Sequence, residues 1–270
     1  MTSTVGVVVS ALEQRFPPEL ASDWDAVGLV CGDPHASVSR VLFAVDPVMA
    51  VVDEAMATGA DMIVTHHPLF LRGVHSVAPT TPKGQVIHTL ISHGIALYCA
   101  HTNADHARPG VSDALAEACG LVETTAIDPP GGEVGTGRVG QLPEPVTLRV
   151  LADRLAVSVP ATEHGLRIAG DPESLVRTVA VCGGAGDSLL ELIGESADVY
   201  VTGDLRHHRA QDYLLDTGKA LIDVPHWAAE WLWLPDVASA LAADLGADTV
   251  STAVSDIDTS PWTVHIGRKS

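Results

Sequence analysis

The fold class follows from one stretch of the chain, VLFAVDPVMAVVDEAMATGADMIVTHH, residues 41–67. Its first apolar run, residues 41–45, predicts a buried strand, and residues 48–58 predict a helix that ends at Gly59. Residues 61–65 form a second apolar run and predict the next strand. A strand, a helix and a strand in this order make a βαβ unit with parallel strands. The sequence therefore predicts an α/β protein.

The same alternation continues on both sides of this unit. Apolar residues recur at helical spacing over residues 5–16 and predict a helix, which the proline pair Pro17-Pro18 ends. Residues 83–92 predict a further helix and residues 95–100 a further strand. Ser112 is expected to cap the helix that ends at Gly120. Further elements are predicted in the second half: helices over 148–155, 187–195 and 205–215, strands over 177–182, 198–202 and 220–224, and a final helix from His226 that Pro235 kinks or divides.

Glycine and proline are concentrated in residues 129–140, which predicts a linker or exposed loop. This segment separates a first α/β domain, residues 1–128, from a second, residues 141–270, whose C-terminal segment is free to pack back on the first. A short sequence echo relates the halves, because DMIVT at 61–65 resembles DVYVT at 198–202. Two interpretations stay open, an internal duplication or chance similarity between α/β segments.

Composition limits the classes of function. The chain has 270 residues, and 15 Lys+Arg against 34 Asp+Glu give a net charge of −19. Such a charge repels polyanions, so duplex nucleic acid is not an expected partner, whereas bound divalent ions would allow a phosphate-bearing small molecule. The 4 cysteines form no C-x-x-C pair, and the first residues do not resemble a secretory signal. No apolar run is long enough to span a membrane, so a cytoplasmic protein is expected.

Metal-binding side chains occur in three clusters, each after an apolar run. They are His66 with His67, His101 with Asp105, and His226 with Glu230. Imidazole and carboxylate ligands suit Zn, Fe, Mn, Co or Ni, and none of the clusters contains the thiolates typical of structural zinc sites. A single histidine at a strand end is more often a structural residue than a ligand. Three such clusters together predict a divided metal site.

The spacing within each cluster limits how it binds metal. Neighbouring residues of a strand face opposite ways, so His66 and His67 can share one ion only if the chain turns there, and otherwise serve two ions. His226 and Glu230 are spaced i, i+4, which places them on one face of a helix. The strand-like residues before His101 favour a loop for the segment up to Asp105.

Two further features each have two interpretations. The glycine segment Gly183-Gly184-Ala185-Gly186 follows a predicted strand and precedes a predicted helix, so it would either cradle a phosphate or form a tight turn. His207 and His208 lie on a predicted helix, where they would either face the site as acid or base groups or be solvated.

Six motifs in a fixed order resemble the GTP cyclohydrolase I type 2 homologue family, also called the NGG-interacting-factor-three-like family. The motifs are Trp24-Asp25-Ala26-Val27-Gly28-Leu29, Thr65-His66-His67-Pro68-Leu69, His101-Thr102-Asn103-Ala104-Asp105, Cys182-Gly183-Gly184-Ala185-Gly186, Val201-Thr202-Gly203-Asp204 and Pro225-His226-Trp227-Ala228-Ala229-Glu230. The resemblance covers nearly the whole chain. It implies two similar α/β domains that face each other across a dinuclear metal cleft, the short form without an inserted middle domain, and a ring-shaped homohexamer.

The resemblance also implies a set of ligands for two divalent ions. His67 and Asp105 would hold one ion, His66 and His226 the other, and Glu230 would bridge both. Five protein ligands for two ions leave coordination positions for water or substrate, as catalytic sites do.

The activity implied by the family name is a hydrolytic opening of the GTP imidazole ring. We expect a small-molecule substrate, attacked at carbon or phosphorus by water activated at the metal pair, with His101 or His208 moving the proton. No residue in the sequence selects guanine. The alternative function is a non-enzymatic metal carrier, regulatory or assembly protein.

Overall fold

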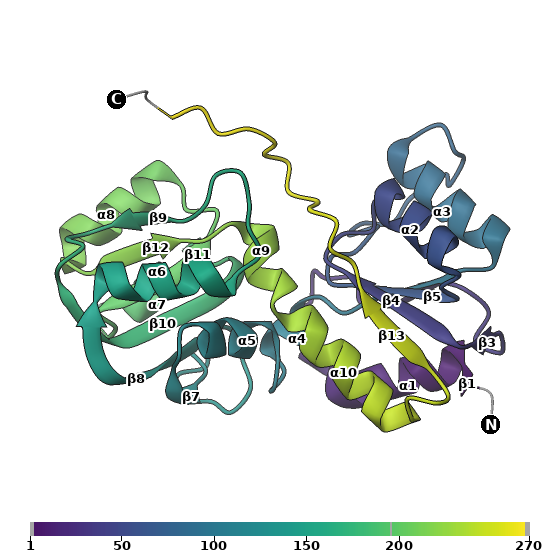
Figure 1. Cartoon of the computed structure of the whole chain (residues 1–270), viewed down its shortest axis with the longest axis horizontal. Coiled ribbons are helices and arrows are strands. Elements are labelled where there is room, and N and C mark those ends of the chain that lie inside the picture. The colour runs from purple at the N-terminus through teal and green to yellow at the C-terminus, as the bar shows by residue number, and fades with distance from the viewer. Residues whose placement is uncertain (1–2, 195, 268–270) are drawn as a thin grey trace. The chain divides into compact units, whose positions relative to one another are not determined.

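The computed structural model describes residues 3–194 and 196–267. The chain divides into two compact units, shown in Figure 1. Unit 1 comprises Met1–Ala107 and Leu234–Thr259, and unit 2 comprises Arg108–Trp233 and Ser260–Ser270. Each unit holds its own mixed β-sheet. The α/β prediction is therefore confirmed.

Unit 1 is built on a five-stranded sheet in the order β13-β4-β5-β6-β2. Strands β13, β4, β5 and β6 are parallel, and β2 runs antiparallel to β6 at one edge. A separate antiparallel pair joins β1 to β3. The strands of this unit are β1 (Ser3–Thr4), β2 (Gly28–Cys31), β3 (Ser37–Val38), β4 (Arg40–Ala44), β5 (Met62–Thr65), β6 (Ala96–Cys99) and β13 (Ser251–Val254).

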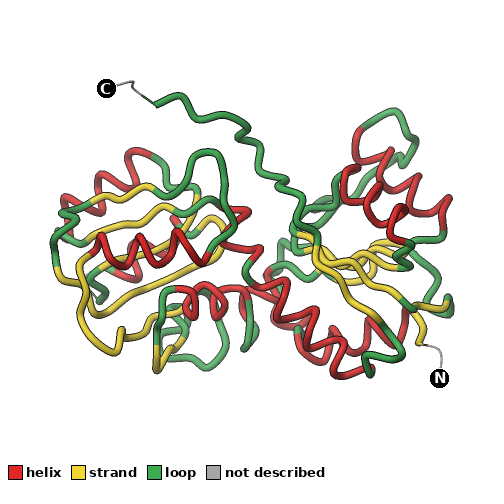
Figure 2. Tube along the Cα trace, viewed as in Figure 1, coloured by secondary structure: helices red, strands yellow, loops and turns green. Residues whose placement is uncertain are grey.

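Helices cover both faces of the unit 1 sheet, with α2 and α3 on one side and α1 and α10 on the other (Figures 1 and 2). The helices are α1 (Val5–Arg15), η1 (Pro18–Leu20), α2 (Met49–Thr58), α3 (Pro82–His93), α4 (Thr102–His106) and α10 (Trp233–Leu245), the last of which starts at the end of unit 2. Leu42, Ile63 and Leu97 of neighbouring strands form one core with Val52 and Leu90 of α2 and α3. Gly59 and Gly94 end these two helices in the left-handed conformation, as their positions in the sequence predict.

Unit 2 is built on a six-stranded sheet in the order β7-β8-β10-β11-β12-β9. Its central strands β10, β11 and β12 are parallel. Strand β8 pairs antiparallel with β10, and β9 pairs antiparallel with β12. Strand β7 pairs antiparallel with β8 at the edge of the sheet. The strands are β7 (Val122–Thr125), β8 (Arg138–Thr147), β9 (Arg167–Ala169), β10 (Leu175–Ala185), β11 (Val199–Gly203) and β12 (Ala220–Asp223). Because β10, β11 and β12 are parallel, their C-terminal ends lie at the same edge of the sheet.

One face of the unit 2 sheet packs against α7 and α8, where Tyr200 and Leu221 of the strands contact Leu190 and Tyr213 of the helices. Helix α6 lies over the opposite face (Figure 1). The helices of this unit are α5 (Val111–Ala118), α6 (Leu148–Ser158), η2 (Asp187–Leu189), α7 (Leu190–Ile193), α8 (His207–Thr217) and α9 (His226–Trp231). Both units thus enclose their sheet between helices, which is the usual way to bury both faces of parallel strands.

The parallel strands at the centre of each unit have the same topology. Strands β4, β5 and β6 of unit 1 are arranged and connected like β10, β11 and β12 of unit 2. Even a local contact repeats. Asp61 Oδ2 accepts hydrogen bonds from Ser39 N at 2.7 Å and Arg40 N at 3.0 Å. Asp198 Oδ2 accepts from Arg177 N and Thr178 N, both at 3.0 Å. An internal duplication predicts this agreement, and the edge strands are where the units differ.

The structure corrects three local predictions. The segment after His101 is the short helix α4 and not a loop. Gly110, and not Ser112, precedes the first turn of α5, and Ser112 Oγ instead accepts a hydrogen bond from Gly183 N at 3.3 Å. Residues 187–193 form a 3-10 turn and a four-residue helix, and the predicted end at Glu195 lies outside the described residues.

The glycine-rich segment 129–140 lies within unit 2, where it connects β7 to β8. Its last residues enter β8, and Arg138 is fully buried. Arg138 Nε and Nη2 donate to the carboxylate of Asp113 at 2.8 Å each. The compact units therefore separate near residue 108. Independent folding of residues 1–128 and 141–270 as domains stays a prediction.

Candidate metal centre

His66 and His67 come directly after strand β5 in unit 1. Backbone hydrogen bonds to Ala44 O at 3.1 Å and Val45 O at 2.8 Å hold them beside the end of β4. Their ring centroids lie 5.1 Å apart with an angle of 44° between the planes. The chain thus leaves the strand geometry that would turn the two side chains to opposite faces, and both imidazoles lie in the same place.

His101 joins this pair from the end of β6. Its ring centroid lies 5.1 Å from that of His66 and 5.6 Å from that of His67. One ligand atom from each of the three histidines lies within 4.8 Å of the others. Helix α4 then places Asp105 Oδ1 at 3.8 Å from His66 Nε2. We call His66, His67 and His101 the histidine cluster.

Each ring of the histidine cluster binds an oxygen atom through Nδ1. His66 Nδ1 lies 3.0 Å from Ala100 O, and His67 Nδ1 lies 2.7 Å from Asp46 Oδ1. A carbonyl or carboxylate oxygen accepts hydrogen bonds, so Nδ1 carries the proton and Nε2 carries the lone pair that binds metal ions. The same carboxylate of Asp46 also accepts a hydrogen bond from Thr259. These contacts fix both the tautomer and the orientation of the rings.

Asp25 performs this function for His101. Its carboxylate accepts from His101 Nδ1 at 2.8 Å, from Thr102 N at 3.0 Å and from Ala26 N at 2.7 Å. Burial by itself would raise the pKa of Asp25, but the hydrogen bonds from His101 and Thr102 outweigh it and hold the pKa well below its usual range. Asp25 is therefore a carboxylate that orients the imidazole of His101.

Unit 2 contributes a second pair of candidate ligands, His226 and Glu230, one turn apart on α9. His226 Nε2 lies 2.9 Å from Glu230 Oε1, and Glu230 is only 3% exposed. His226 Nδ1 lies 2.8 Å from Asp204 Oδ2, and this hydrogen bond lowers the pKa of Asp204. The orientation of His226 thus follows the pattern of the histidine cluster.

The glycine segment 183–186 runs past this pair. Strand β10 extends to Ala185, so the turn begins only at Gly186. At Gly184, where φ is +64°, an added Cβ would lie 2.4 Å from Glu230 Oε1 and 3.3 Å from His226 Nε2. Gly184 therefore lets the backbone approach the two ligands closely, a role that the sequence did not indicate.

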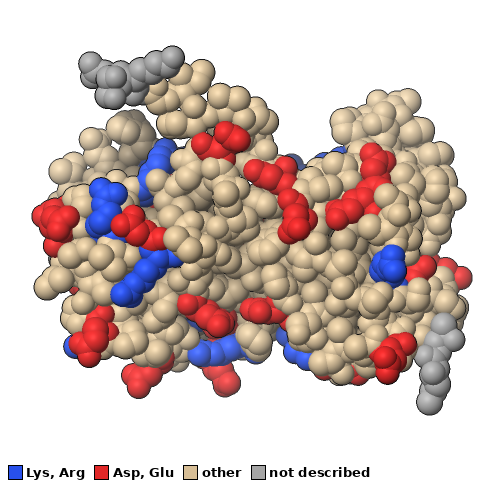
Figure 3. Space-filling model, viewed as in Figure 1, with Lys and Arg blue, Asp and Glu red and all other residues tan. Residues whose placement is uncertain are grey.

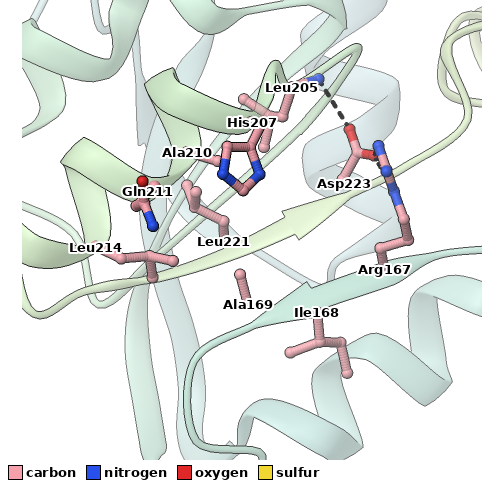
Figure 4. Close-up of a pocket in the computed structure, with 10 residues that line it drawn as sticks. All are labelled: Arg167, Ile168, Ala169, Leu205, His207, Ala210, Gln211, Leu214, Leu221 and Asp223. Carbon is pink, nitrogen blue, oxygen red and sulfur yellow. Dashed lines mark hydrogen bonds and ion pairs between the residues drawn. The ribbon is translucent and has the colours of Figure 1, made fainter.

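The predicted proton carrier His208 is exposed on the first turn of α8. Its ring lies 5.1 Å from that of His207. His207 faces a pocket of about 420 Å³ between α8 and strands β9 and β12, shown in Figure 4. At the rim of this pocket Arg167 Nε donates to Asp223 Oδ2 at 2.7 Å. The role of His208 in proton transfer stays a prediction.

Sequence reasoning missed the carboxylates that orient the histidines. Asp204 directly follows strand β11, and Asp46 lies just beyond the end of strand β4. Asp25 lies in the loop before β2. Acidic residues just beyond the ends of parallel strands are a usable signal, because those ends meet at one edge of a sheet. The identity of each partner, however, is a tertiary contact that spacing along the chain does not reveal.

Charge and hydropathy agree with the composition. Asp and Glu side chains are visible over both units in Figure 3. Among residues 3–194 and 196–267, no helix is long and apolar enough to cross a bilayer.

Comparison with known proteins assigns the family. A family model described as Duf34/NIF3 (NGG1p interacting factor 3) matches residues 3–261. A Streptomyces coelicolor protein named "GTP cyclohydrolase 1 type 2 homolog" is 51% identical over 96% of this chain and 93% of its own length. A Mycobacterium bovis protein of the same name is 37% identical over 97% of each chain, in an alignment of 372 positions. The crystal structure of a Bacillus cereus protein related to NIF3 superposes with a TM-score of 0.90 at 25% identity, covering 98% of this chain and 100% of that one.

Proposed function

The chain belongs to the Duf34/NIF3 (NGG1p interacting factor 3) family, in a short form of 270 residues, and we propose that it is a metal-dependent hydrolase. The single observation that carries the proposal is the orientation of the imidazoles. His66, His67, His101 and His226 each bind a carbonyl or carboxylate oxygen through Nδ1. Histidine ligands of metal ions in proteins are oriented in this way.

The chemistry of the donor set supports metal binding over a purely structural role. A structural histidine is satisfied by one or two hydrogen bonds and does not need two more imidazoles beside it. Here three imidazoles are grouped within unit 1, and a carboxylate of α4 lies beside them. Protonating three neighbouring rings would bring like charges together, whereas one or two divalent ions are bound by the neutral rings.

We assign the ligands as the family resemblance implies. By that resemblance His67 and Asp105 would hold one divalent ion, His66 and His226 would hold the other, and Glu230 would be a ligand of both. The 2.9 Å between His226 Nε2 and Glu230 Oε1 fits two ligands of one ion, because donors at about 2.1 Å from a metal lie roughly 3 to 3.5 Å apart. Zn, Fe, Mn, Co and Ni all suit these donors.

The bound ions would supply Lewis acidity, which activates water and polarises a carbonyl or phosphoryl group. The protein residues hold and move protons around them. In this proposal His101 accepts or delivers a proton at Nε2, and Asp25 holds the orientation of its ring through the hydrogen bond at Nδ1. His208 is proposed as the second proton carrier.

The proposed substrate is a small molecule, with a phosphate group as one option. A net charge of −19 disfavours a polyanion, and bound divalent cations would reverse the local sign for a compact anion. The relatives carry the name of a GTP cyclohydrolase homologue, so ring-opening hydrolysis of GTP is the first reaction to test. We further propose a cytoplasmic homohexamer, as the same resemblance implies.

Metal analysis followed by turnover assays tests the proposal. The purified protein, loaded in turn with Zn²⁺, Mn²⁺, Fe²⁺, Co²⁺ and Ni²⁺, would be assayed with GTP and a panel of phosphate esters. We expect two ions per chain and turnover that Glu230→Ala abolishes. Tight binding of two ions without turnover above the Glu230→Ala level would favour the alternative, a metal carrier or regulatory protein. Failure to bind any ion would exclude both.

A further inference from the structure

Trp24 is an exposed aromatic residue beside the histidine cluster. It is 60% exposed, and its ring centroid lies 5.9 Å from that of His101 in an edge-on arrangement with an angle of 80°. Two other tryptophans, Trp227 at 6% and Trp233 at 3% exposure, are buried in the core. An indole left in water next to a group of metal-binding rings therefore calls for an explanation other than packing.

The loop that carries Trp24 is rigidly attached to the histidine cluster. The next residue, Asp25, has a fully buried carboxylate that binds both His101 and the backbone of Thr102. Asp25 N donates to Ser22 O at 2.9 Å, and Ser22 N donates to Thr102 Oγ1 at 2.9 Å. The backbone on both sides of Trp24 is thus fixed relative to His101, so less conformational entropy is lost when a ligand packs against the indole.

We propose that Trp24 is a binding surface for a planar heteroaromatic ring of the substrate, which stacks on the indole while its reacting group lies at the histidine cluster. The proposal rests on the proposed function, because the cluster is taken to be the reaction site. Distances support it, since the ring centroids run from Trp24 to His101 at 5.9 Å and from His101 to His66 at 5.1 Å. A molecule of nucleotide size spans that range.

The chemistry of the surface points to a planar ring and not to an aliphatic chain. Indole faces attract flat π-systems, and stacking tolerates differences in ring substituents because every heteroaromatic base has a π-face. Nothing else among the described contacts of Trp24 selects one base. The inference therefore names a class, planar nitrogen heterocycles attached to a phosphate-bearing group.

Binding measurements on the whole, metal-loaded protein test this inference. The probes are guanosine 5′-monophosphate, which carries a planar base, and ribose 5-phosphate, which does not. Trp24→Ala should weaken binding of the nucleotide about tenfold or more while leaving ribose 5-phosphate binding unchanged, because only the stacking contact is lost. Trp24→Phe should restore part of the affinity. Trp262→Ala is the matched control, since Trp262 is 64% exposed but belongs to unit 2, and it should change neither affinity.

The outcomes separate this inference from the proposed function. Metal content measured on each variant reports on the proposed function alone, and guanosine binding to metal-free protein reports on stacking alone. Equal nucleotide affinity in wild type and Trp24→Ala would overturn the inference, as would wild-type protein that binds no nucleoside or nucleotide. A change in oligomer mass of Trp24→Ala without a change in affinity would show that the indole contacts another copy, and would overturn it too.

Discussion

At the scale of single residues, the candidate metal centre consists of imidazoles and the oxygen atoms that orient them. Candidate ligands could be chosen from the sequence because His and acidic residues after apolar runs have few other reasons to cluster, and their role as ligands stays a prediction. The orienting groups Asp46 and Ala100 O could not, because one follows a different strand and the other is a backbone atom. The sequence gives the chemical type of each side chain, whereas the hydrogen-bond partner of each side chain depends on the fold.

Asp204→Asn tests the orienting role at a single residue. The amide can still meet His226 Nδ1, but it no longer stabilises the imidazole by charge, so metal affinity should fall about 10- to 100-fold. Isothermal titration with Zn²⁺ measures the change. Asp216→Asn, an exposed carboxylate on α8, is the control and should bind metal like wild type. Unchanged affinity in Asp204→Asn would show that His226 is oriented by other contacts.

At the scale of elements, the predicted strands of the parallel centres are confirmed, and so are helices α2, α3 and α8, whereas the helix predicted between β10 and β11 is a 3-10 turn and a four-residue helix. Short apolar runs define β5 and β11, and glycines in the left-handed conformation end α2, which precedes β5, and α8, which follows β11. Edge strands were missed. Strand β9 has 3 residues and β7 is partly polar, so their pairing depends on the neighbouring strand and not on their own pattern. Helix α4 has 5 residues, too few for a helical period to show.

Strand β10 supplies a prediction about the approach of backbone to ligand. Gly184→Ala adds a Cβ that would lie 2.4 Å from Glu230 Oε1, in addition to the strain of a positive φ. Gly218→Ala has nearly the same φ, +66°, with nothing within 4 Å of the new atom, and so measures the strain alone. We expect Gly218→Ala to lose about 1 kcal/mol of unfolding free energy and Gly184→Ala to lose at least as much. Only Gly184→Ala should also bind metal more weakly. Equal metal affinity in the two variants would contradict the proposed role of the glycine.

The start of β11 supplies a prediction about pH. Burial would raise the pKa of Asp198, but hydrogen bonds from the backbone of Thr178 and Arg177 and from Lys219 outweigh it and lower the pKa. A lowered pKa in the folded state means that the stabilisation is complete above the unfolded value of about 3.9, declines below that value, and is lost once the pH has fallen through the lower pKa of the folded state. Asp198→Asn should therefore lower the unfolding free energy by about 1 kcal/mol at pH 7.

Urea unfolding of the metal-free protein at pH 7, 5 and 3.5 measures this effect. The difference between wild type and Asp198→Asn should persist from pH 7 to pH 5 and shrink at pH 3.5. The control is Asp212→Asn, an exposed carboxylate on α8, which should unfold like wild type at each pH. A difference that grows on acidification would contradict the assignment.

At the scale of the whole molecule, neither unit is a single continuous segment of the chain. Unit 1 begins with the first residues and is completed only by Leu234–Thr259, which follows the segment Arg108–Trp233 of unit 2. A composition change such as the glycine-rich segment 129–140 marks an exposed connection, here between β7 and β8, and carries no information about a chain that returns to an earlier unit. The pairing of β13 with β4 is a contact between residues more than 200 positions apart, such as Ser251 with Arg40.

This returning segment is a substantial part of the unit 1 core. Leu234, Leu241 and Val250 are fully buried, and β13 forms the edge of the sheet beside β4. Burying each such side chain contributes about 1.5 to 3 kcal/mol, so losing these three alone removes roughly 4.5 to 9 kcal/mol, which is comparable to the 5 to 15 kcal/mol that typically stabilises a domain. A chain that stops after residue 233 should therefore lack a folded unit 1. A chain that stops after residue 259 keeps both elements, and the removed residues 261–267 are exposed, so it should melt like wild type. Calorimetry and limited proteolysis of the two truncated chains measure the difference, and cleavage within residues 3–107 should occur only in the shorter one.

Because His66, His67 and His101 belong to unit 1, the shorter chain should also lose metal binding. Retained metal binding would mean that the strand ends carrying these histidines form without the C-terminal helix and strand.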